Sequence, residues 1–293
     1  MISKIKPQKG KDYKNLPKKI LECFDDTKYL VSTKYDGNQI FIVKEGSMIR
    51  FFTSDWKEFS IQLIAMELRD ISSDFVIVGE FLYNSDGKLG SRGKSAILTT
   101  FRTNFSKGWL NGQAEIGSQV VAFDYIPLVN GELQTKTRQD NRLGMLNQIL
   151  DGKFLTQPVH VELMSGAEAR EYTKELVKHG WEGTMLTQPH EFYHLGKRVN
   201  HAIKLKERPT ADLLCIDYED GEGKYDCMIG SLILKDSAGR VVKVGSGLTD
   251  SDRLLHNQHK FIGSIIEIQY EQILDTYIQP TFVGVRDDKN VPD

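Results

Sequence analysis

The chain has 293 residues, of which 40% are hydrophobic and 27% charged, and its formal net charge is −2. This length favours two domains, and the composition is that of an ordinary globular protein. No run of about 18 apolar residues is present, and the basic N-terminus lacks an apolar core, so we expect neither a membrane span nor a signal peptide. Three scattered cysteines without metal-ligand spacing favour a reducing, cytoplasmic compartment.

Strand-like patterns dominate the first two thirds of the chain. Runs of apolar and β-branched residues predict strands at 39–43, 48–53, 75–82, 119–126, 184–187 and 202–205. Helical periodicity predicts helices at 57–71, 138–150 and 165–179. The third helix is the best defined, because Ser165 and Glu168 form an S-x-x-E capping box and Gly180 follows as a stop.

The pattern changes after Lys206, where residues 207–210 have the composition of a linker. Strand-like runs split by glycine turns follow at 212–218, 225–234, 240–244 and 264–270, with a short helix near 250–258. This arrangement predicts a small all-β barrel of the OB type. We therefore expect domains at 1–206 and 207–293.

Charge is distributed unevenly between these two parts. Residues 1–206 carry 29 Lys and Arg against 24 Asp and Glu, whereas residues 207–293 carry 9 against 16. A basic first domain favours a polyanionic partner, although an ordinary solvated surface explains the charge equally well.

The sequence K-Y-D-G at 34–37 contains a candidate nucleophile, Lys34. A lysine amine has a usual pKa of about 10.4 and becomes a useful nucleophile only when desolvation or neighbouring cations favour its neutral form. Taken alone, this tetrapeptide favours an exposed lysine at a turn.

Further along the chain, charged residues recur in strand-like segments. Glu80 ends V-G-E, Glu182 begins E-G-T-M, and I-K-L-K carries Lys204 and Lys206. Because these two lysines are two residues apart, they project from one face of a strand. Two lysines on a half-buried face are costly unless they meet anions, and phosphates are suitable anions.

In order and spacing, KYDG, VGEF, VAFDY, EGTM and IKLK resemble the motifs of ATP-dependent DNA ligases, members of the covalent nucleotidyltransferase superfamily. PTFVGVRDDK at 280–289 resembles the last motif of the superfamily, and residues 221–247 resemble a ligase OB domain. The resemblance implies an α+β fold, with a mixed-sheet nucleotidyltransferase (adenylation) domain followed by a small all-β OB-fold domain. Within this family the chain looks like a small bacteriophage- or virus-type enzyme.

The resemblance implies that Lys34 attacks the α-phosphate of ATP and forms a lysyl-AMP. Lys204 and Lys206 would contact that phosphate, and Asp36 completes the implied catalytic set. A divalent ion, Mg²⁺ or Mn²⁺, would be held by Glu182, Glu80 and Asp36, because hard cations prefer oxygen ligands.

The resemblance also implies the nucleotide contacts. Phe123 would stack on adenine with Met185 on the other face, and Glu80 would hold the ribose. Arg286 would orient the pyrophosphate when the OB domain closes. The full implied nucleotide-binding set is Ser32, Thr33, Lys34, Tyr35, Glu80, Phe123, Glu182, Met185, Lys204, Lys206 and Arg286.

The AMP would then pass to the 5′-phosphate at a nick in duplex DNA, and the adjacent 3′-hydroxyl would expel it and seal the strand. Candidate DNA-phosphate contacts are Arg50, Arg92, Lys94, Lys197 and Arg198. The sequence departs from the family at Gln39 and Ser54, where small DNA ligases usually have arginines. Arg50, Lys57 and Arg92 are candidate replacements.

Three other functions stay open at this point: an RNA ligase of the same superfamily, an mRNA capping guanylyltransferase, and a non-catalytic OB-fold protein that binds nucleic acid. The DNA-ligase-like OB segment favours the DNA ligase. We expect a monomer that acts in the cytoplasm of a bacterial or virus-infected cell.

Overall fold

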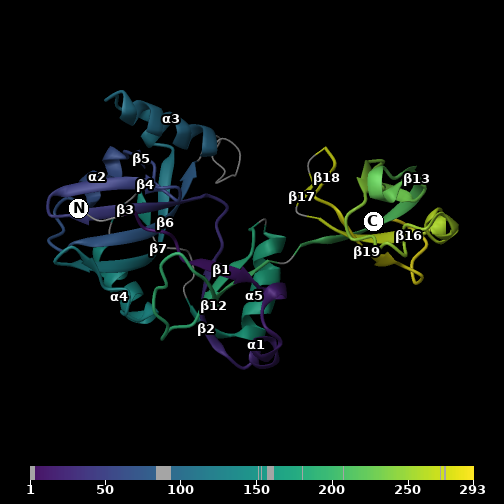
Figure 1. Cartoon of the computed structure of the whole chain (residues 1–293), viewed down its shortest axis with the longest axis horizontal. Coiled ribbons are helices and arrows are strands. Elements are labelled where there is room, and N and C mark those ends of the chain that lie inside the picture. The colour runs from purple at the N-terminus through teal and green to yellow at the C-terminus, as the bar shows by residue number, and fades with distance from the viewer. Residues whose placement is uncertain are drawn as a thin grey trace. The chain divides into compact units, whose positions relative to one another are not determined.

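The structure is a computed structural model of the chain. It describes residues 4–83, 94–150, 152, 154–156, 162–179, 181–206, 208–270, 272–273 and 275–293. The chain divides into two compact units, Met1–Glu207 and Arg208–Asp293 (Figure 1). The division expected after residue 206 falls one residue from this boundary. In the part of the chain that the structure describes, no helix is long and apolar enough to cross a membrane.

The first sheet of unit 1 gathers strands that are far apart in the sequence. Its order is β1 (Lys9–Asp12), β12 (Arg198–Leu205), β11 (Thr184–Thr187), β2 (Lys28–Thr33) and β10 (Glu162–Ser165). Beside this sheet lie the helices α1 (Lys18–Cys23) and α5 (Gly166–Lys178) (Figure 1). The 3₁₀ turn η1 (Tyr13–Asn15) follows β1 in the chain. One face of the sheet packs into an apolar core that contains Phe24, Val31, Ala169, Ile203 and Leu205.

The second sheet of unit 1 is larger. Its order is β5 (Glu58–Phe59), β4 (Met48–Thr53), β3 (Asn38–Glu45), β6 (Phe75–Tyr83), β7 (Ser118–Val129) and β8 (Glu132–Leu133), and β9 (Leu155–Thr156) also pairs with β7. The remaining elements of the unit are α2 (Gln62–Leu68), α3 (Lys94–Ser106), η2 (Gly112–Glu115) and α4 (Gln139–Ile149). The three helices contribute Ile64, Phe101 and Leu146 to the same core as Ile42 and Ile77 of the sheet.

The second sheet is buried on both faces at its centre. Successive residues of β3 alternate between two cores, with Ile40 and Ile42 in the helix-covered core and Phe41 and Val43 in the other. Burial on both sides explains why these strands read as continuous apolar runs in the sequence. Phe123 packs against the second of these cores.

Unit 2 is mainly β structure. Its sheet has the order β15 (Val241–Val244), β14 (Ile229–Lys235), β13 (Thr210–Asp220), β16 (Ile265–Gln269) and β19 (Thr281–Val285). The other elements are η3 (Gly223–Tyr225), η4 (Leu255–Asn257), α6 (Gln258–Phe261) and the hairpin strands β17 (Gln272–Ile273) and β18 (Tyr277–Ile278). Leu213, Leu232, Val244, Phe261 and Ile266 form part of its core.

Some element boundaries differ from those that the sequence predicts. The helix expected at 57–71 is restricted to α2, because Phe59 pairs with Phe51 of β4 as strand β5. The strand expected from residue 225 begins at Ile229, after the 3₁₀ turn η3. The capping box of α5 is confirmed, since Glu168 N donates to Ser165 Oγ at 3.2 Å and Ser165 N donates to Glu168 Oε2 at 2.6 Å. Gly180 lies outside the described residues.

Candidate active site

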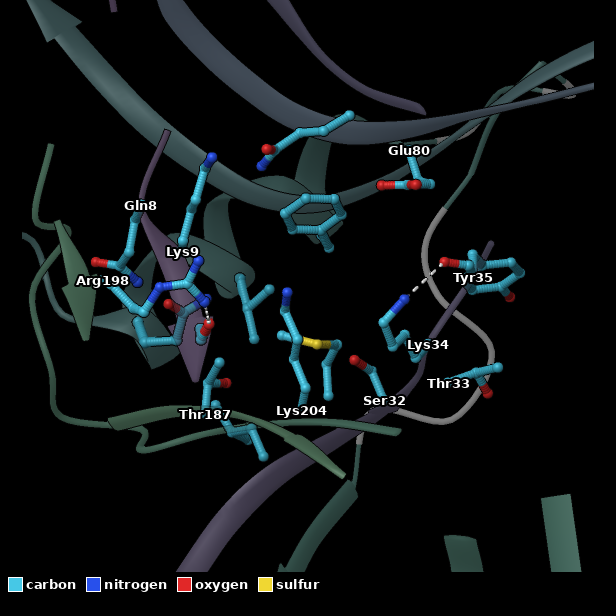
Figure 2. Close-up of a pocket in the computed structure, with 17 residues that line it drawn as sticks. Gln8, Lys9, Ser32, Thr33, Lys34, Tyr35, Glu80, Thr187, Arg198 and Lys204 are labelled. Atoms are coloured by element: carbon cyan, nitrogen blue, oxygen red, sulfur yellow. Dashed lines mark hydrogen bonds between the residues drawn. The ribbon is translucent and has the colours of Figure 1, made fainter. Parts of the chain in front are cut away.

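A cavity of about 400 Å³ opens between the two sheets of unit 1 (Figure 2). It brings together most of the site residues that the sequence predicts for this unit. The predicted residues that line it are Ser32, Thr33, Lys34, Tyr35, Glu80, Phe123, Met185, Arg198 and Lys204. A cavity of this size with a few convergent polar groups is the usual form of a small-molecule site.

One wall of the cavity is a row of side chains across the first sheet. Ser32 of β2 pairs with Met185 of β11, which in turn pairs with Lys204 of β12. Residues opposite one another in neighbouring strands face the same side of a sheet. Ile203 and Leu205 point to the other side, into the apolar core of the first sheet that contains Phe24, as the alternation predicts. The sheet register therefore places Lys204 beside the strand that leads to Lys34.

Lys34 follows directly after the end of β2. Its backbone N–H donates to Gly183 O at 2.8 Å, which fixes it to the turn before β11. Its Nζ donates to Glu182 Oε2 and lies 3.5 Å from Tyr35 O. The side chain is only 17% exposed, and Figure 2 shows Lys34 and Lys204 extending toward the side of the cavity where Glu80 lies. Lys34 is thus a half-buried, positioned amine.

Steric contacts explain why K-Y-D-G ends in a glycine, Gly37. A Cβ at Gly37 would lie 2.4 Å from Glu80 Cγ and 2.6 Å from Phe81 O. Real Cβ atoms do not approach other atoms so closely, so only glycine allows this turn to lie against β6. Gly37 N–H donates to Glu80 Oε1 at 2.9 Å. This contact joins the turn that carries Lys34 to the opposite wall of the cavity.

A β-bulge aims Phe123 into the cavity. Val78 of β6 pairs with Asp124 of β7, but the next residue, Gly79, pairs with Ala122, so Phe123 is the extra residue. A bulge re-directs a side chain and is common beside active sites. A Cβ at Gly79 would lie 2.7 Å from Val120 Cγ1, so glycine permits this close approach of the two strands.

Glu182 connects two of the predicted catalytic lysines. Its Oε2 accepts from Lys34 and its Oε1 accepts from Lys206. Neither Glu182 nor Lys206 lines the cavity, and Asp36 is exposed outside it. The expected metal ligands Asp36, Glu80 and Glu182 are among the described residues, and their oxygens do not form a group within 4.8 Å of one another.

The electrostatic setting of Lys204 is unfavourable for its charge. Burial lowers the pKa of Lys204 below the usual lysine value, and the nearby cations Lys34, Arg198 and Lys206 lower it further, against an opposing effect of Asp12. Among the described residues that line the cavity, cations outnumber the one carboxylate, Glu80, and such an excess is suited to an anionic ligand.

Arg50 and Lys57 are candidate replacements for the family arginine missing at Gln39. Neither lines the cavity, and Arg50 donates to Glu45 Oε2 at 2.6 Å. Among the residues that the structure describes, the cations that line it, besides Lys34 and Lys204, are Lys9 and Arg198. Lys197 is exposed. Arg92 lies outside the described residues, and of Lys94 only the backbone, at the start of α3, is described.

Sequence reasoning missed Lys9 because β1 was not predicted. β1 joins the sheet by parallel pairing with β12, and the two strands are almost 190 residues apart. The basic N-terminal segment was visible in the sequence, but its place beside the cavity depends on this long-range pairing. Arg198 Nη1 donates to Gly10 O at 3.1 Å and so ties the two strands together at the cavity wall.

Arg286 lies in unit 2, at the end of β19. Its guanidinium donates to Asp212 Oδ2 at 3.0 Å and to Asp288 Oδ2 at 2.7 Å. These anions raise the pKa of Arg286, and Arg286 in turn lowers the pKa of Asp288 to about 2. Each partner belongs to the same unit, so the structure describes Arg286 as part of unit 2 alone.

A buried ionic network backs the cavity, and the sequence did not predict it. Arg142 of α4 donates to Asp124 Oδ1 at 2.7 Å and to Asp124 Oδ2 at 3.1 Å, and it also donates to Gln139 Oε1. Its remaining nitrogen donates to Thr137 O at 2.5 Å. Gln139 lines the cavity, so this network holds α4 against the strand that carries Phe123.

Comparisons with known proteins agree with this geometry. Residues 7–206 match the family model of the ATP dependent DNA ligase domain, and residues 220–286 match that of the DNA ligase OB-like domain. A DNA ligase of Natronomonas pharaonis is 27% identical over 90% of this chain and 52% of that protein. A DNA ligase of Thermococcus onnurineus is 25% identical over 98% of this chain and 56% of that protein. The chain therefore spans about half the length of the curated relatives it matches.

A solved structure of a Lig E DNA ligase, described as binding DNA with a minimal scaffold, aligns with 98% of this chain and 100% of that chain. The TM-score is 0.61 and the sequence identity is 20%, so this likeness supports the fold. The predicted fold class, an α+β adenylation domain followed by an OB-like domain, is confirmed. Because residues 7–206 match the model of the ATP dependent DNA ligase domain, the chain belongs to the family of ATP-dependent DNA ligases.

Proposed function

We propose that this chain is an ATP-dependent DNA ligase that seals nicks in duplex DNA between a 3′-hydroxyl and a 5′-phosphate. The observation that carries the proposal is the position of Lys34. Its amine lies at a cavity large enough for a nucleotide, beside a second cation, Lys204, on the adjoining wall. The family to which the chain belongs supports the same reaction.

The first step requires a change at Lys34. Its Nζ donates to Glu182 in this structure, and a protonated amine has no free electron pair. The neutral amine of Lys34 forms the bond to the α-phosphorus of ATP, and the proton that its Nζ loses passes to the Glu182 carboxylate and on to solvent. The bond to pyrophosphate breaks, and pyrophosphate leaves. Lys204 and Lys206 supply positive charge near the phosphate oxygens, where negative charge spreads in the transition state.

The walls of the cavity suit a nucleotide. Phe123 and Met185 approach from opposite sheets, which fits an adenine ring held between them. Glu80 lies across the cavity from the lysines, and its carboxylate would accept a hydrogen bond from a ribose hydroxyl. Backbone groups of Ser32 and Thr33 would contact the adenine edge, and Tyr35 lies beside Lys34. Arg286 would contact the pyrophosphate if unit 2 closes over the cavity.

The second and third steps use DNA. A phosphate oxygen of the 5′-phosphate attacks the lysyl-AMP and frees Lys34, and the 3′-hydroxyl then attacks the 5′-phosphorus and expels AMP. We propose that Lys9 and Arg198 bind the nick phosphates in place of an arginine at Gln39, because both line the cavity. Lys197, Arg50, Arg92 and Lys94 remain candidates for contacts farther along the DNA backbone.

A divalent ion, Mg²⁺ or Mn²⁺, would screen the charge of the phosphates when bound. Glu182, Glu80 and Asp36 offer hard oxygen ligands. Because their oxygens do not gather within 4.8 Å of one another, one or two of these carboxylates, together with substrate phosphates and water, would hold the ion, as is usual for Mg²⁺. Glu182 would exchange Lys34 or Lys206 for the ion.

We also propose that one copy of the chain acts alone, in the cytoplasm. Unit 1 by itself supplies the amine, the cations and the aromatic ring that line the cavity. Cys23, Cys215 and Cys227 are all free thiols, which fits a reducing compartment.

Sealing assays with ATP and Mg²⁺ test the proposal. We expect ligation of nicked duplex DNA and a fall in DNA affinity as salt rises, because phosphates dominate the contacts. Sealing of nicked RNA alone would favour the RNA ligase. Covalent labelling by GTP instead of ATP would favour a capping guanylyltransferase, and DNA binding without any covalent adduct would favour a non-catalytic module.

A further inference from the structure

Three metal-ligating side chains gather in unit 1 apart from the proposed ligase site. Glu191, His194 and His201 each offer one ligand atom, and these atoms all lie within 4.8 Å of one another. Glu191 and His194 belong to the segment between β11 and β12, and His201 lies on β12. None of the three lines the cavity. The nucleotide and DNA chemistry proposed above therefore gives this cluster no role.

The spacing of the cluster is close to that of a metal site. His201 Nδ1 lies 3.6 Å from Glu191 Oε2, which is too long for a hydrogen bond. In a tetrahedral zinc site with bonds of about 2.1 Å, neighbouring ligand atoms are about 3.4 Å apart. The rings of His194 and His201 have centroids 5.2 Å apart at 46° to each other, so they do not stack. Small side-chain movements would bring the three groups around one ion.

His201 lacks the hydrogen bonds that a buried imidazole usually makes. Its side chain is 14% exposed, and its Nε2 is buried without a hydrogen-bond partner. A buried polar atom left without a partner costs about 1–3 kcal/mol, so such atoms call for an explanation. With Nδ1, the nitrogen 3.6 Å from Glu191 Oε2, as the ligand of an ion, Nε2 carries the proton of the ring and is not satisfied by the ion itself.

The backbones of the three residues are held in place by hydrogen bonds. His194 N–H donates to Gln8 Oε1 at 2.7 Å, and His201 O accepts from Gln188 N–H at 3.0 Å. Glu191 O accepts from Gln139 N–H at 2.9 Å. Binding of an ion here needs little rearrangement of the chain, and preorganisation of this kind favours affinity.

We propose that Glu191, His194 and His201 bind a divalent transition-metal ion, with Zn²⁺ as the ion that this ligand set suits best. Two imidazoles and one carboxylate are a recognised zinc set, with water in the fourth position. Nitrogen ligands disfavour Mg²⁺, so this ion is distinct from the one that accompanies ATP. The ion fastens the segment around Glu191 and His194 to β12. Gln8 and Gln139, which hold this segment, both line the cavity, so the ion also stiffens that wall.

The test uses the full chain after removal of metal by a chelator. We expect equilibrium dialysis with Zn²⁺ to show one tightly bound ion per chain, and the melting temperature to rise with Zn²⁺ concentration. Co²⁺ in place of Zn²⁺ should give the visible absorption bands of a tetrahedral site. Absence of tight binding, or melting curves unchanged by Zn²⁺, overturns the proposal.

Ligand variants locate the site. Glu191→Gln and His194→Gln replace partly exposed side chains, so we expect both to fold with the melting temperature of the metal-free wild type. Each should weaken Zn²⁺ binding by roughly tenfold or more and remove the Zn²⁺-dependent rise in melting temperature. His201→Gln should remove the Co²⁺ bands.

Two control variants address other histidines. The first, His190→Gln, changes the residue before Glu191, and the His190 side chain is 71% exposed. The second combines His256→Gln with His259→Gln, both in unit 2. Both should bind Zn²⁺ as the wild type does. If a control loses the ion while Glu191→Gln and His194→Gln keep it, the ion belongs elsewhere and the proposal is wrong.

Discussion

Two clusters of charged side chains in unit 1 differ in how completely they are buried. In the first, Glu182 receives both Lys34 and Lys206, and the three side chains are 26%, 17% and 39% exposed. In the second, Arg142 is fully buried and its partner Asp124 is 7% exposed. The first cluster has more cations than anions at the edge of a cavity, and the second is closed and saturated with hydrogen bonds.

This difference separates charges that can exchange partners from charges that hold the fold. A partly exposed carboxylate that serves two lysines can release one of them to a phosphate or a metal ion at modest cost, because water and the second lysine remain. A buried guanidinium cannot lose its carboxylate without leaving an uncompensated charge. We therefore expect changes in the first cluster to affect chemistry and changes in the second to affect stability.

The largest stability effect is expected for Arg142→Met. This change leaves Asp124 buried without its cation, and we expect the free energy of unfolding to fall by about 3–5 kcal/mol. Chemical denaturation measures it. Arg138→Met is the matched control on the Arg138–Asp140 pair, in which the Arg138 side chain is 45% exposed, and should cost about 0–1 kcal/mol. Equal losses in both variants would remove the distinction between the clusters.

The largest effect within the first cluster, apart from loss of Lys34 itself, is expected for Glu182→Gln. The change keeps the shape of the side chain but leaves two lysines without their shared anion. We expect the rate of self-adenylation to fall roughly 10²–10³-fold while the free energy of unfolding changes by less than about 1 kcal/mol. Glu175→Gln removes an exposed carboxylate paired with Lys178 and should change neither. A stable, fully active Glu182→Gln would contradict the role of this cluster.

A smaller effect is expected at the turn after Lys34. Gly37→Ala places a methyl group against Glu80 and the backbone of β6, and we expect a loss of about 1–3 kcal/mol with slower adenylation. Gly144→Ala is the control. Gly144 lies within α4 with no atom near its Cβ position, so this change should stabilise the protein by about 0.4–1 kcal/mol. Unchanged stability of Gly37→Ala would show that the turn can move.

The smallest effect concerns the stability contributed by Lys204. Its pKa is lowered in the folded protein, so its charge opposes folding wherever the folded group is still protonated. Lys204→Met should therefore be more stable than the wild type at neutral pH, by less than about 1 kcal/mol, although its adenylation is impaired. This advantage should shrink as pH rises toward the usual lysine pKa of about 10.5. A destabilised Lys204→Met at neutral pH would contradict this account.

Local sequence patterns predicted much of the fold and the centre of the site. Alternating and continuous apolar runs located β3, β4, β6, β7 and β11, and the capping box located α5. Lys34 lies three residues before Gly37, Glu80 follows Gly79, and Lys204 stands in the alternating run I-K-L-K. Short segments were therefore enough to single out these three residues. These residues line one cavity.

Long-range pairing determined what the sequence did not predict. Lys9 lines the cavity because β1 pairs with β12, and Arg142 meets Asp124 because α4 packs on β7. Glu191, His194 and His201 show no regular ligand spacing, and they meet only because the segment before β12 folds back. Parallel pairing and helix packing of this kind depend on the whole fold, so single-segment patterns carry no signal for them.

The central claim is that Lys34 is the nucleophile, and one measurement tests it most directly. The protein is incubated with ATP and Mg²⁺, and mass spectrometry of its peptides locates the attached AMP. We predict one adenylyl group on Lys34 and none on a Lys34→Ala variant that unfolds like the wild type. An adenylyl group on Lys204 or another residue, or equal labelling of Lys34→Ala, would contradict the account.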